Sequence, residues 1–477
     1  MMREGITFHD VLLVPKRSDV TSRKHVDTTG RFSKNITLKS PLVSANMDTV
    51  TEARMAIAMA QAGGLGVIHR FLKIDEQVAE VAKVKRAENV IIEDPYTVGP
   101  DDTIEGAKLS MQRLEVGGLL VVDRERKLLG VVTQRDLQFH EDPKTPLRRV
   151  MSKKLVTAKP GLSLEQAREI LRENKIEKLP LVDPKGVLLG LITAKDIKAK
   201  AHHPFASKDK KGRLMAGAAV GVVGDFMERS AALLDAGADC LVVDVAHGHA
   251  DHVIEAVKRI KKKFPNAELV AGNVATYEGA RDLAAAGADG VKVGVGPGSI
   301  CSTRIVSGSG VPQLTAVMDC AKITKERGIP ICADGGLRDS GDITKALAAG
   351  ASSVMLGSLL AGAEESPGWT VVRNGQRYKV YRGMASLSAT ISRKRKESAT
   401  DDLDPIEVAE TVPEGVESMA SYKGAVSEVL FQLQGGVRSG MSYSGARTLA
   451  DFWQKAEFIK ITAASWAESR PHHLDKQ

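Results

Sequence analysis

Short apolar runs rich in β-branched residues alternate along the chain with longer stretches of helical periodicity. Runs that are apolar at consecutive positions are typical of parallel strands buried on both faces by helices. Eight such runs predict strands at residues 41–47, 64–69, 214–220, 240–246, 268–274, 290–295, 330–336 and 353–357. The alternation of strands with helices indicates an α/β protein with a parallel sheet.

An Ala-Gly-Ala turn followed by a strand occurs three times, as AGADCLVVD, AGADGVKVG and AGASSVMLG. Each copy follows a helix-like stretch and ends in a small or acidic residue. Eight parallel strands with crossover helices predict a (β/α)8 TIM barrel, whose chemistry lies at the C-terminal ends of the strands. An open doubly wound sheet is the alternative, but G-x-G-x-x-G with an acidic residue about 20 positions later is missing from the sequence.

A second repeat fills the long interval between the second and third predicted strands. Residues 103–136 and 162–196 share a helix, then LLVVD or LPLVD, then LLGVVTQRD or LLGLITAKD. The pair resembles two cystathionine-β-synthase (CBS) modules, in which the aspartate of T-x-x-D contacts a nucleotide ribose. Asp136 and Asp196 are therefore candidate nucleotide-binding residues, although each can equally cap the helix that follows it.

These repeats predict a barrel that is interrupted by an inserted domain. We expect barrel segments at 1–87 and 206–477, and a tandem CBS module at 88–205, divided into about 88–148 and 149–205. Residues 386–423 are polar and lack barrel periodicity, which is typical of a mobile flap over a functional site.

The composition is that of a soluble globular protein. The 477 residues are 43% hydrophobic and 26% charged, enough for two or three domains. No stretch approaches the roughly 20 apolar residues of a membrane span, and the N-terminus has no signal-peptide core, so we expect a cytoplasmic protein. The four cysteines form no C-x-x-C pair, which disfavours a zinc site or a disulfide framework.

The net charge of +8 raises the question of a nucleic-acid partner, and basic runs occur at 258–263 and 393–396. Only 4% of residues are aromatic, however, so the chain has few side chains that could stack on nucleic-acid bases. The first run continues a helical pattern and is explained as a solvated helix face. A phosphorylated small molecule accounts for the positive charge equally well, so we do not expect nucleic acid.

The segment VGVGPGSICSTR, residues 293–304, is the strongest candidate for catalysis. It follows a predicted strand, and its glycines can turn backbone N–H groups toward a ligand. Those dipoles and a nearby cation such as Arg304 can hold Cys301 as thiolate, the form that attacks an electrophilic carbon. A lone cysteine is more often buried in the core. Cys301 differs because its neighbours are small and polar, whereas the other three cysteines lie in apolar stretches.

Two neighbouring strand ends suit a nucleotide monophosphate. In ADGGLRDSGD, Asp334 can accept hydrogen bonds from ribose hydroxyls, while the backbone N–H groups of Gly335 and Gly336 can hold phosphate. Gly357 and Ser358 follow the next predicted strand, and adjacent barrel strands commonly share one phosphate site. The same glycines also fit plain tight turns between strand and helix.

Motifs along nearly the whole chain resemble the IMP dehydrogenase/GMP reductase family in order and spacing. Between about residues 7 and 473 they are FHDVLLVP, SANMDTVTE, SKDKKGRL, VVDVAHGH, AGNVAT, GVGPGSICSTR, VPQLTAV, ADGGLRDSGD, VMLGSLLAG, KVYRGM and PEGVE. The resemblance implies that Cys301 attacks C2 of IMP, that hydride leaves for NAD, and that water releases XMP, a step of guanine nucleotide synthesis. It places Thr303 beside the adduct, in a proton path with Glu414.

The resemblance also implies the binding residues. Those for the nucleotide are Met47, Ser299, Asp334, Gly335, Gly336, Gly357, Ser358, Tyr381, Gly383, Met384 and Glu414. Those for the cofactor are Asp244, Asn273 and Gly294. A potassium site would use Gly296, Gly298 and Cys301 together with Glu468, Ser469 and Arg470 of a neighbouring subunit. This sharing implies a homotetramer or an octamer, and the CBS pair implies adenine or guanine nucleotides as ligands.

The flap departs from the family pattern. In IMP dehydrogenases it carries an adjacent Arg-Tyr pair before P-E-G, and the arginine activates the hydrolytic water. Between residues 386 and 413 this chain has no such pair, and offers Arg393 and Arg395 instead. Either arginine could replace the missing one, or Thr303 and Glu414 could activate water alone. The chain could also run the GMP reductase reaction, in which NADPH reduces GMP to IMP and ammonia leaves.

Two other segments separate these hypotheses. GGVRSGMSYSGA and VVDVAHGH resemble dehydrogenases more than reductases, so we expect an IMP dehydrogenase. A catalytically degraded nucleotide sensor is a third hypothesis, but a pure binding protein would not need Cys301, Thr303 and Glu414.

Overall fold

The computed structural model describes residues 2–469 except 88–91, 93–94, 115, 139, 141, 163, 195–196, 198–202 and 392–411. The chain forms two compact units, one of Met1–Ala87 with Phe205–Gln477 and the other of Glu88–Pro204. None of the helices in the described ranges has the length and apolar character that a bilayer span requires.

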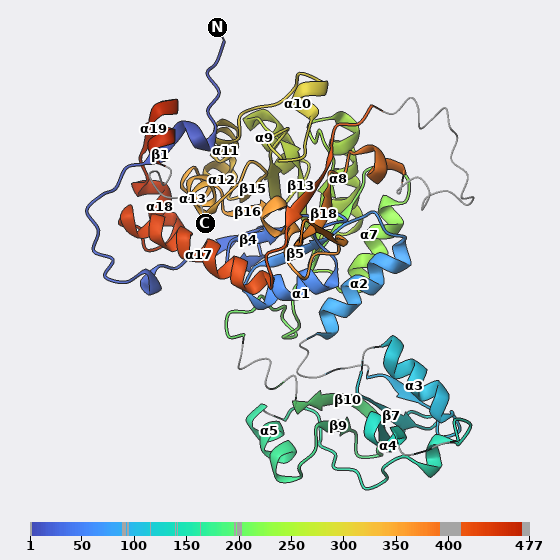
Figure 1. Ribbon diagram of the computed structural model, residues 1–477. Coiled ribbons are helices and arrows are strands. Elements are labelled where there is room, and N and C mark those ends of the chain that lie inside the picture. Colours follow the sequence, from blue (N-terminus) through green and yellow to red (C-terminus); the bar gives the residue numbers. More distant parts are fainter. Residues whose placement is uncertain are drawn as a thin grey trace. The chain divides into compact units, whose positions relative to one another are not determined.

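The larger unit is a closed barrel of eight parallel strands, seen in the centre of Figure 1. The strands are β4 (Leu42–Ser44), β5 (Leu65–Ile68), β11 (Gly217–Val220), β12 (Cys240–Asp244), β13 (Glu268–Val274), β14 (Gly290–Val293), β15 (Ile331–Asp334) and β16 (Ser353–Leu356). The predicted (β/α)8 barrel and all eight predicted strands are confirmed. The first strand is shorter than predicted because the chain turns after Ser44, where the N–H of Met47 donates to the carbonyl of Ala45 (2.8 Å).

Strand residues alternate between the barrel interior and the surrounding helix layer. In β12, Val242 faces inward with Val43 and Val270, whereas Leu241 and Val243 pack among the helices. Both faces of each strand are buried, which explains why the strands are continuous apolar runs in the sequence.

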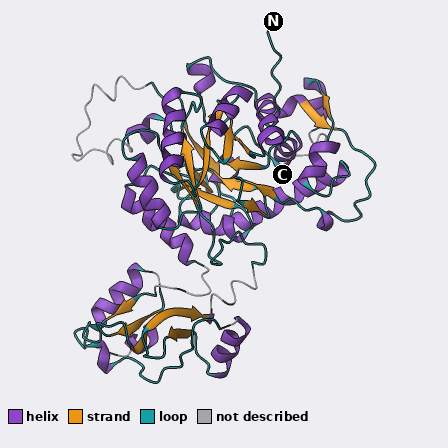
Figure 2. Cartoon of the chain, turned by 180° about the vertical axis from the view of Figure 1, so that it is seen from behind, coloured by secondary structure: helices purple, strands orange, loops and turns teal. Residues whose placement is uncertain are grey.

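Helices surround the barrel, as the view from behind shows (Figure 2). They are α1 (Ala53–Gln61), α2 (Ile74–Arg86), α7 (Phe226–Asp235), α8 (Asp251–Lys263), α9 (Tyr277–Ala285), α11 (Gln313–Cys320), α12 (Lys322–Arg327), α13 (Ser340–Ala348) and α17 (Val426–Tyr443). The short α10 (Thr303–Val306) and α14 (Ser358–Ala361) begin at strand ends. Because α17 packs on both α13 and α1, it fills the eighth outer position, although a long segment separates it from β16.

The larger unit also contains smaller sheets and short helices that are not part of the eight-stranded barrel. A sheet of β17 (Thr370–Arg373), β18 (Gln376–Arg382) and β19 (Glu417–Ser421) lies between β16 and α17 in the sequence. The hairpin of β2 (Gly30–Arg31) and β3 (Thr37–Leu38) carries apolar residues of the interior cluster, and it closes the N-terminal end of the barrel. The remaining elements are η1 (Phe8–Asp10), β1 (Val11–Leu13), η2 (Arg23–His25), α18 (Leu449–Lys455), β20 (Phe458–Lys460) and α19 (Ala463–Glu468); β1 pairs with β20.

The smaller unit contains two similar halves. Its elements are β6 (Thr97–Val98), α3 (Ile104–Arg113), β7 (Gly118–Val122), β8 (Leu128–Thr133), α4 (Gln134–Gln138), η3 (Leu147–Arg149), α5 (Leu164–Glu173), β9 (Lys178–Val182) and β10 (Leu188–Thr193). Each half has its own core, and the strands β7 and β10 share a third cluster that includes Leu120 and Leu188. Asp136 accepts hydrogen bonds from the backbone N–H (2.8 Å) and hydroxyl (2.7 Å) of Thr133, so its carboxylate caps α4. Asp196 lies outside the described residues.

Candidate active site

The loop after β14 needs glycine where it leaves the barrel. Gly294 has φ +151°, and a Cβ there would lie 2.0 Å from the carbonyl oxygen of Asp334. Farther along, a Cβ on Gly335 would lie 3.0 Å from the ring of Pro297. The Cys301 loop therefore packs directly against the loop that follows β15.

All four cysteines lie in the described residues, and Cys301 alone is exposed. Burial raises the pKa of the Cys332 thiol to about 12 and also raises the pKa values of Cys240 and Cys320. A thiol with so high a pKa is not a nucleophile at neutral pH. Among the four, Cys301 is the only one placed to react with a ligand.

A hydrogen-bond chain leads away from the Cys301 thiol. Its Sγ lies 3.2 Å from the hydroxyl of Thr303, and that hydroxyl donates to Glu414 Oε2 at 2.7 Å. The backbone holds this chain in place, because the N–H of Ser302 donates to the carbonyl of Glu414 (2.9 Å). A second bond joins the same two segments, because the N–H of Val416 donates to the carbonyl of Ile300 (3.0 Å). The arrangement can carry a proton from a group at the thiol to a carboxylate.

Arg304, suggested from the sequence as a cation near the thiolate, makes its hydrogen bonds to the loop backbone. Its guanidinium donates to the carbonyls of Val311 (2.6 Å) and Val295 (3.4 Å). Its aliphatic stem fills the space beside Gly296. Arg304 therefore braces the loop backbone.

The residues assigned to the nucleotide base and phosphate converge beside Cys301. The hydroxyl of Tyr381 lies 3.9 Å from the sulfur of Met47, and a Cβ on Gly357 would be 3.0 Å from that hydroxyl. Burial raises the pKa of Tyr381 to about 12, against the opposing effect of a hydrogen bond with Ser299. Gly335 and Gly336 both have positive φ (+88° and +75°), and Ser358 begins α14.

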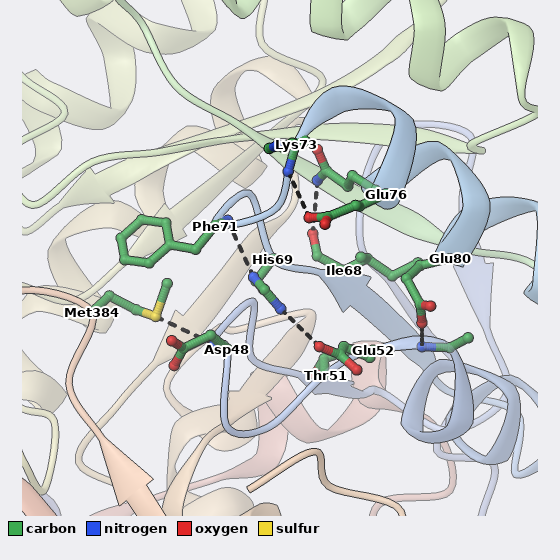
Figure 3. Close-up of polar contacts among 12 residues, drawn as sticks. Asp48, Thr51, Glu52, Ile68, His69, Phe71, Lys73, Glu76, Glu80 and Met384 are labelled. Atoms are coloured by element: carbon green, nitrogen blue, oxygen red, sulfur yellow. Dashed lines mark hydrogen bonds and ion pairs between the residues drawn. The ribbon is translucent and has the colours of Figure 1, made fainter. Parts of the chain in front are cut away.

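Asp48 and Arg382, which the sequence did not single out, connect the loops that were assigned to the base. The carboxylate of Asp48, next to Met47, pairs with the guanidinium of Arg382, whose Nε lies 3.0 Å away. The N–H of Asp48 lies 3.4 Å from the sulfur of Met384, as Figure 3 shows. A Cβ on Gly383 would lie 3.3 Å from the carbonyl of Ile300, so this segment approaches the Cys301 loop closely.

The turn after β5 is fixed by His69, which is buried (Figure 3). Its Nδ1 accepts from the N–H of Phe71 (3.1 Å), and its Nε2 faces Glu52 at 3.4 Å. Arg70 lies between His69 and Phe71 in the sequence, and its positive charge lowers the pKa of Asp244 at the end of β12. This turn thus places a positive charge near a residue that the sequence assigned to the cofactor.

Three assigned residues, Asp244, Asn273 and Asp334, gather around Lys292, which was not predicted. The ammonium of Lys292 lies 2.7 Å from Asp244 Oδ1 and 2.7 Å from Asp334 Oδ2, and it also contacts Asn273 Oδ1. Burial works to raise the pKa of Asp244, but Lys292 and Arg70 hold it below its usual value. The strand ends therefore carry a compact group of two carboxylates around one cation.

The remaining assigned residues are placed as follows. Gly296 has φ +82°, and the carbonyl of Gly298 accepts from the N–H of Cys301 at 3.1 Å. Glu468 and Ser469 end α19, which packs on η1. Arg393, Arg395 and Arg470 lie outside the described residues. Across the described ranges, no three histidine, cysteine, aspartate or glutamate side chains gather as a metal site of such ligands would require.

Comparison with known proteins places the whole chain in one group. A family model described as "IMP dehydrogenase / GMP reductase domain" matches residues 5–472. Curated relatives named inosine-5'-monophosphate dehydrogenase include one from Nitrosopumilus maritimus, 60% identical over 99% of both chains, and one from Aquifex aeolicus, 52% identical over 99% of this chain and 96% of the relative. A solved structure of a GMP reductase variant from Trypanosoma brucei, in complex with guanosine 5'-monophosphate, matches with a TM-score of 0.92, 45% identity and 99% of both chains covered.

Proposed function

The chain belongs to the IMP dehydrogenase/GMP reductase family, and we propose that it oxidises IMP to XMP with NAD through a covalent bond between Cys301 and C2 of the purine. The observation that carries this proposal is the chain from Cys301 through Thr303 to Glu414, set beside the residues that suit a nucleotide. Relatives at 60% and 52% identity that are named inosine-5'-monophosphate dehydrogenase support the choice of IMP as substrate.

In this mechanism the thiolate of Cys301 adds to C2 of IMP, and the tetrahedral carbon then loses hydride. NAD, when bound, accepts that hydride. Hydrolysis follows, and Thr303 takes a proton from the attacking water as its own hydroxyl proton passes to Glu414. The bond from C2 to Cys301 then breaks and XMP leaves. General-base assistance of this kind typically contributes about 10²–10⁴-fold.

The residues present fit both ligands. Asp334 would accept from the nucleotide ribose and the glycine-rich turns would hold its phosphate, while Met47, Tyr381 and Met384 would hold the base. On the cofactor side, Asp244 remains ionised at neutral pH because its pKa is lowered, so it can accept from ribose hydroxyls. Asn273 shares the ammonium of Lys292 with Asp244, and its amide donates to the carbonyl of Gly294 (2.7 Å).

Further parts of the proposal concern potassium, assembly and regulation. The carbonyls of Gly296, Gly298 and Cys301 would contribute to a potassium site, completed by residues 468–470 of a neighbouring subunit in a homotetramer. The smaller unit, about residues 88–205, would be a tandem CBS module that binds adenine or guanine nucleotides. Its two similar halves, each with a separate core, support this assignment.

A second candidate function is GMP reductase. The specific observation in its favour is the missing Arg-Tyr pair in the flap, together with the close match to a solved GMP reductase structure. Cys301, Thr303 and Glu414 would serve there too, with ammonia as the leaving group in place of the hydrolysis step.

Turnover with two substrate pairs separates the candidates. With IMP and NAD, formation of NADH and XMP supports the dehydrogenase. Consumption of NADPH with GMP, and no reaction with IMP, would replace it with the reductase. A single burst of NADH without steady turnover would show that Cys301 forms the adduct but that hydrolysis fails. If neither substrate pair reacts, the result favours a nucleotide sensor and contradicts both enzymatic proposals.

A further inference from the structure

Lys292 occupies an unusual place for a lysine. It lies in β14 between Val291 and Val293, which pack among the outer helices, so its own side chain points into the barrel. Only 2% of the residue is exposed. An ammonium buried in this way normally loses its proton unless anions hold it.

Two carboxylates keep Lys292 charged. Burial alone would lower its pKa, but the attraction of Asp244 and Asp334 raises it above the ordinary value. Its contacts go to three different strand ends, namely β12 (Asp244, 2.7 Å), β13 (Asn273) and β15 (Asp334, 2.7 Å). All three donors of the ammonium therefore have an acceptor.

A second set of bonds ties this group to the catalytic loop. The amide of Asn273 donates to Asp334 Oδ2 (3.0 Å) and to the carbonyl of Gly294 (2.7 Å), the first residue after β14. The same Asp334 Oδ2 also accepts a hydrogen bond from the ammonium of Lys292. A change in the charge or position of either carboxylate therefore reaches the other carboxylate through Lys292, and it reaches the Cys301 loop through Asn273.

We propose that Lys292 is a positioning residue that couples nucleotide binding at Asp334 to cofactor binding at Asp244. The proposal rests on the proposed function, which assigns those two carboxylates to the two ribose groups. When ribose hydroxyls donate to Asp334, the ammonium is drawn less strongly to it and more strongly to Asp244. By linkage, the cofactor must affect nucleotide affinity by the same factor.

The test measures dissociation constants, in a Cys301→Ala background so that no reaction occurs. The affinities of IMP and GMP are measured with and without NAD or NADPH, from pH 6 to pH 9. Lys292→Met keeps the length of the side chain and removes its charge. We expect it to abolish the coupling between nucleotide affinity and cofactor affinity, which typically amounts to about 5–150-fold in coupled sites.

The pH dependence has a definite sign. In the intact cluster the pKa of Asp244 is lowered, so its carboxylate is ionised across this range. Without Lys292, only Arg70 and the hydrogen bond from Asn46 oppose the effect of burial, so the pKa of Asp244 rises and its carboxylate takes up a proton more readily as the pH falls. Cofactor affinity of Lys292→Met should therefore weaken toward pH 6, whereas the parent protein should change little.

Two further variants separate positioning from a general loss of structure. Lys292→Met alone leaves two carboxylates without their shared cation and should also weaken nucleotide affinity. Adding Asp244→Asn returns the group to its original net charge, so the double variant should restore nucleotide affinity while cofactor affinity stays weak. Lys85→Met is the matched control, because Lys85 is also buried between two aspartates, Asp239 (2.7 Å) and Asp209 (3.0 Å), at the other end of the barrel. It should lower stability without changing either affinity.

The outcomes are distinct. Unchanged coupling in Lys292→Met, or no rescue in the double variant, overturns the proposal even if the enzyme oxidises IMP. Affinity losses of equal size in Lys85→Met and Lys292→Met would show a merely structural role and also overturn it. If the parent protein binds neither IMP nor GMP, the proposed function fails first and the coupling fails with it.

Discussion

The two sides of the candidate site are built differently. On the carboxylate side, Asp244, Lys292 and Asp334 belong to barrel strands, and the lysine at their centre is fully buried. On the thiol side, Cys301 is exposed on a loop, and its hydrogen-bond chain ends at Glu414, which lies 111 positions from Thr303 in the sequence. The segment that carries Glu414 joins the Cys301 loop through backbone hydrogen bonds, not through the barrel.

This difference separates binding from reaction. Charges that must hold a ligand in one orientation are set by the most rigid part of the fold, so they need no rearrangement when the ligand arrives. The group proposed to form and break a covalent bond, Cys301, stands on a loop that can adjust between steps of a reaction. Changes on the thiol side should therefore affect turnover, and changes on the carboxylate side should affect affinity.

The largest effect should come from Cys301→Ala. Loss of the nucleophile should reduce turnover by a factor on the order of 10⁵ or more. Nucleotide affinity should change only a few-fold, because Asp334 and Tyr381 remain in place. Steady-state kinetics and calorimetry on the same preparation measure the two quantities. A large loss of affinity would show that the thiol also holds the ground state, which would remove the separation argued above.

Glu414→Gln should have the next largest effect. The amide cannot receive the proton that Thr303 passes on, so adduct hydrolysis should slow by roughly 10²–10⁴-fold. Hydride transfer should survive, and rapid mixing with IMP and NAD should show a burst of about one NADH per site before slow turnover. Glu417→Gln, three residues along on the exposed strand β19, is the control and should keep normal turnover. Loss of the burst together with turnover would place Glu414 in the first chemical step instead.

The sequence predicted the barrel well because each strand is buried on both faces. That burial leaves a continuous apolar run, and all eight runs correspond to strands. The candidate residues at strand ends could also be predicted, since barrels place their chemistry there. The Cys301 loop was recognisable because small and polar residues surround the cysteine.

Lys292 could not be predicted in the same way. In GVKVGVG, a single lysine between two valines fits a strand with one solvated face, and only closure of the barrel turns that face inward. The pair of Asp48 and Arg382 was hidden by the 334 positions between them. The eighth outer helix, α17, was hidden because the flap and a small sheet separate it from β16. These misses share one cause, which is that the contacts join segments with no local pattern in common.

Asp48→Asn should weaken nucleotide affinity moderately. It removes the charge opposite Arg382, whose neighbours Gly383 and Met384 contact the base in the proposed function. We expect the KM for nucleotide to rise by about tenfold, equal to about 1.4 kcal/mol, with kcat little changed. Asp19→Asn is a matched control, since Asp19 pairs with Arg447 at 3.0 Å on the exposed surface, where such pairs contribute little. A fall in kcat with constant KM would assign Asp48 to the thiol side.

The smallest kinetic effect should come from Gly440→Ala, in the helix pair that joins the two sides. α13 starts after the Asp334 loop and α17 starts after the Glu414 segment, and the two helices approach closely at two glycines of α17, Gly436 and Gly440. A Cβ on Gly440 would lie 2.4 Å from the methyl group of Thr344. Alanine improves helix propensity by about 1 kcal/mol, but overpacking of this kind costs roughly 1–3 kcal/mol, so a small net loss of stability is expected.

Gly435→Ala provides the matched control, because nothing lies within 4 Å of a Cβ placed there. It should gain the propensity without the clash, and denaturant titration of both variants measures the difference. KM and kcat should change less than threefold in either, since neither helix carries a group that reacts. If Gly440→Ala instead lowered kcat with constant KM, the spacing of α13 and α17 would have to set the position of Glu414. The thiol side would then depend on the barrel wall as closely as the carboxylate side does.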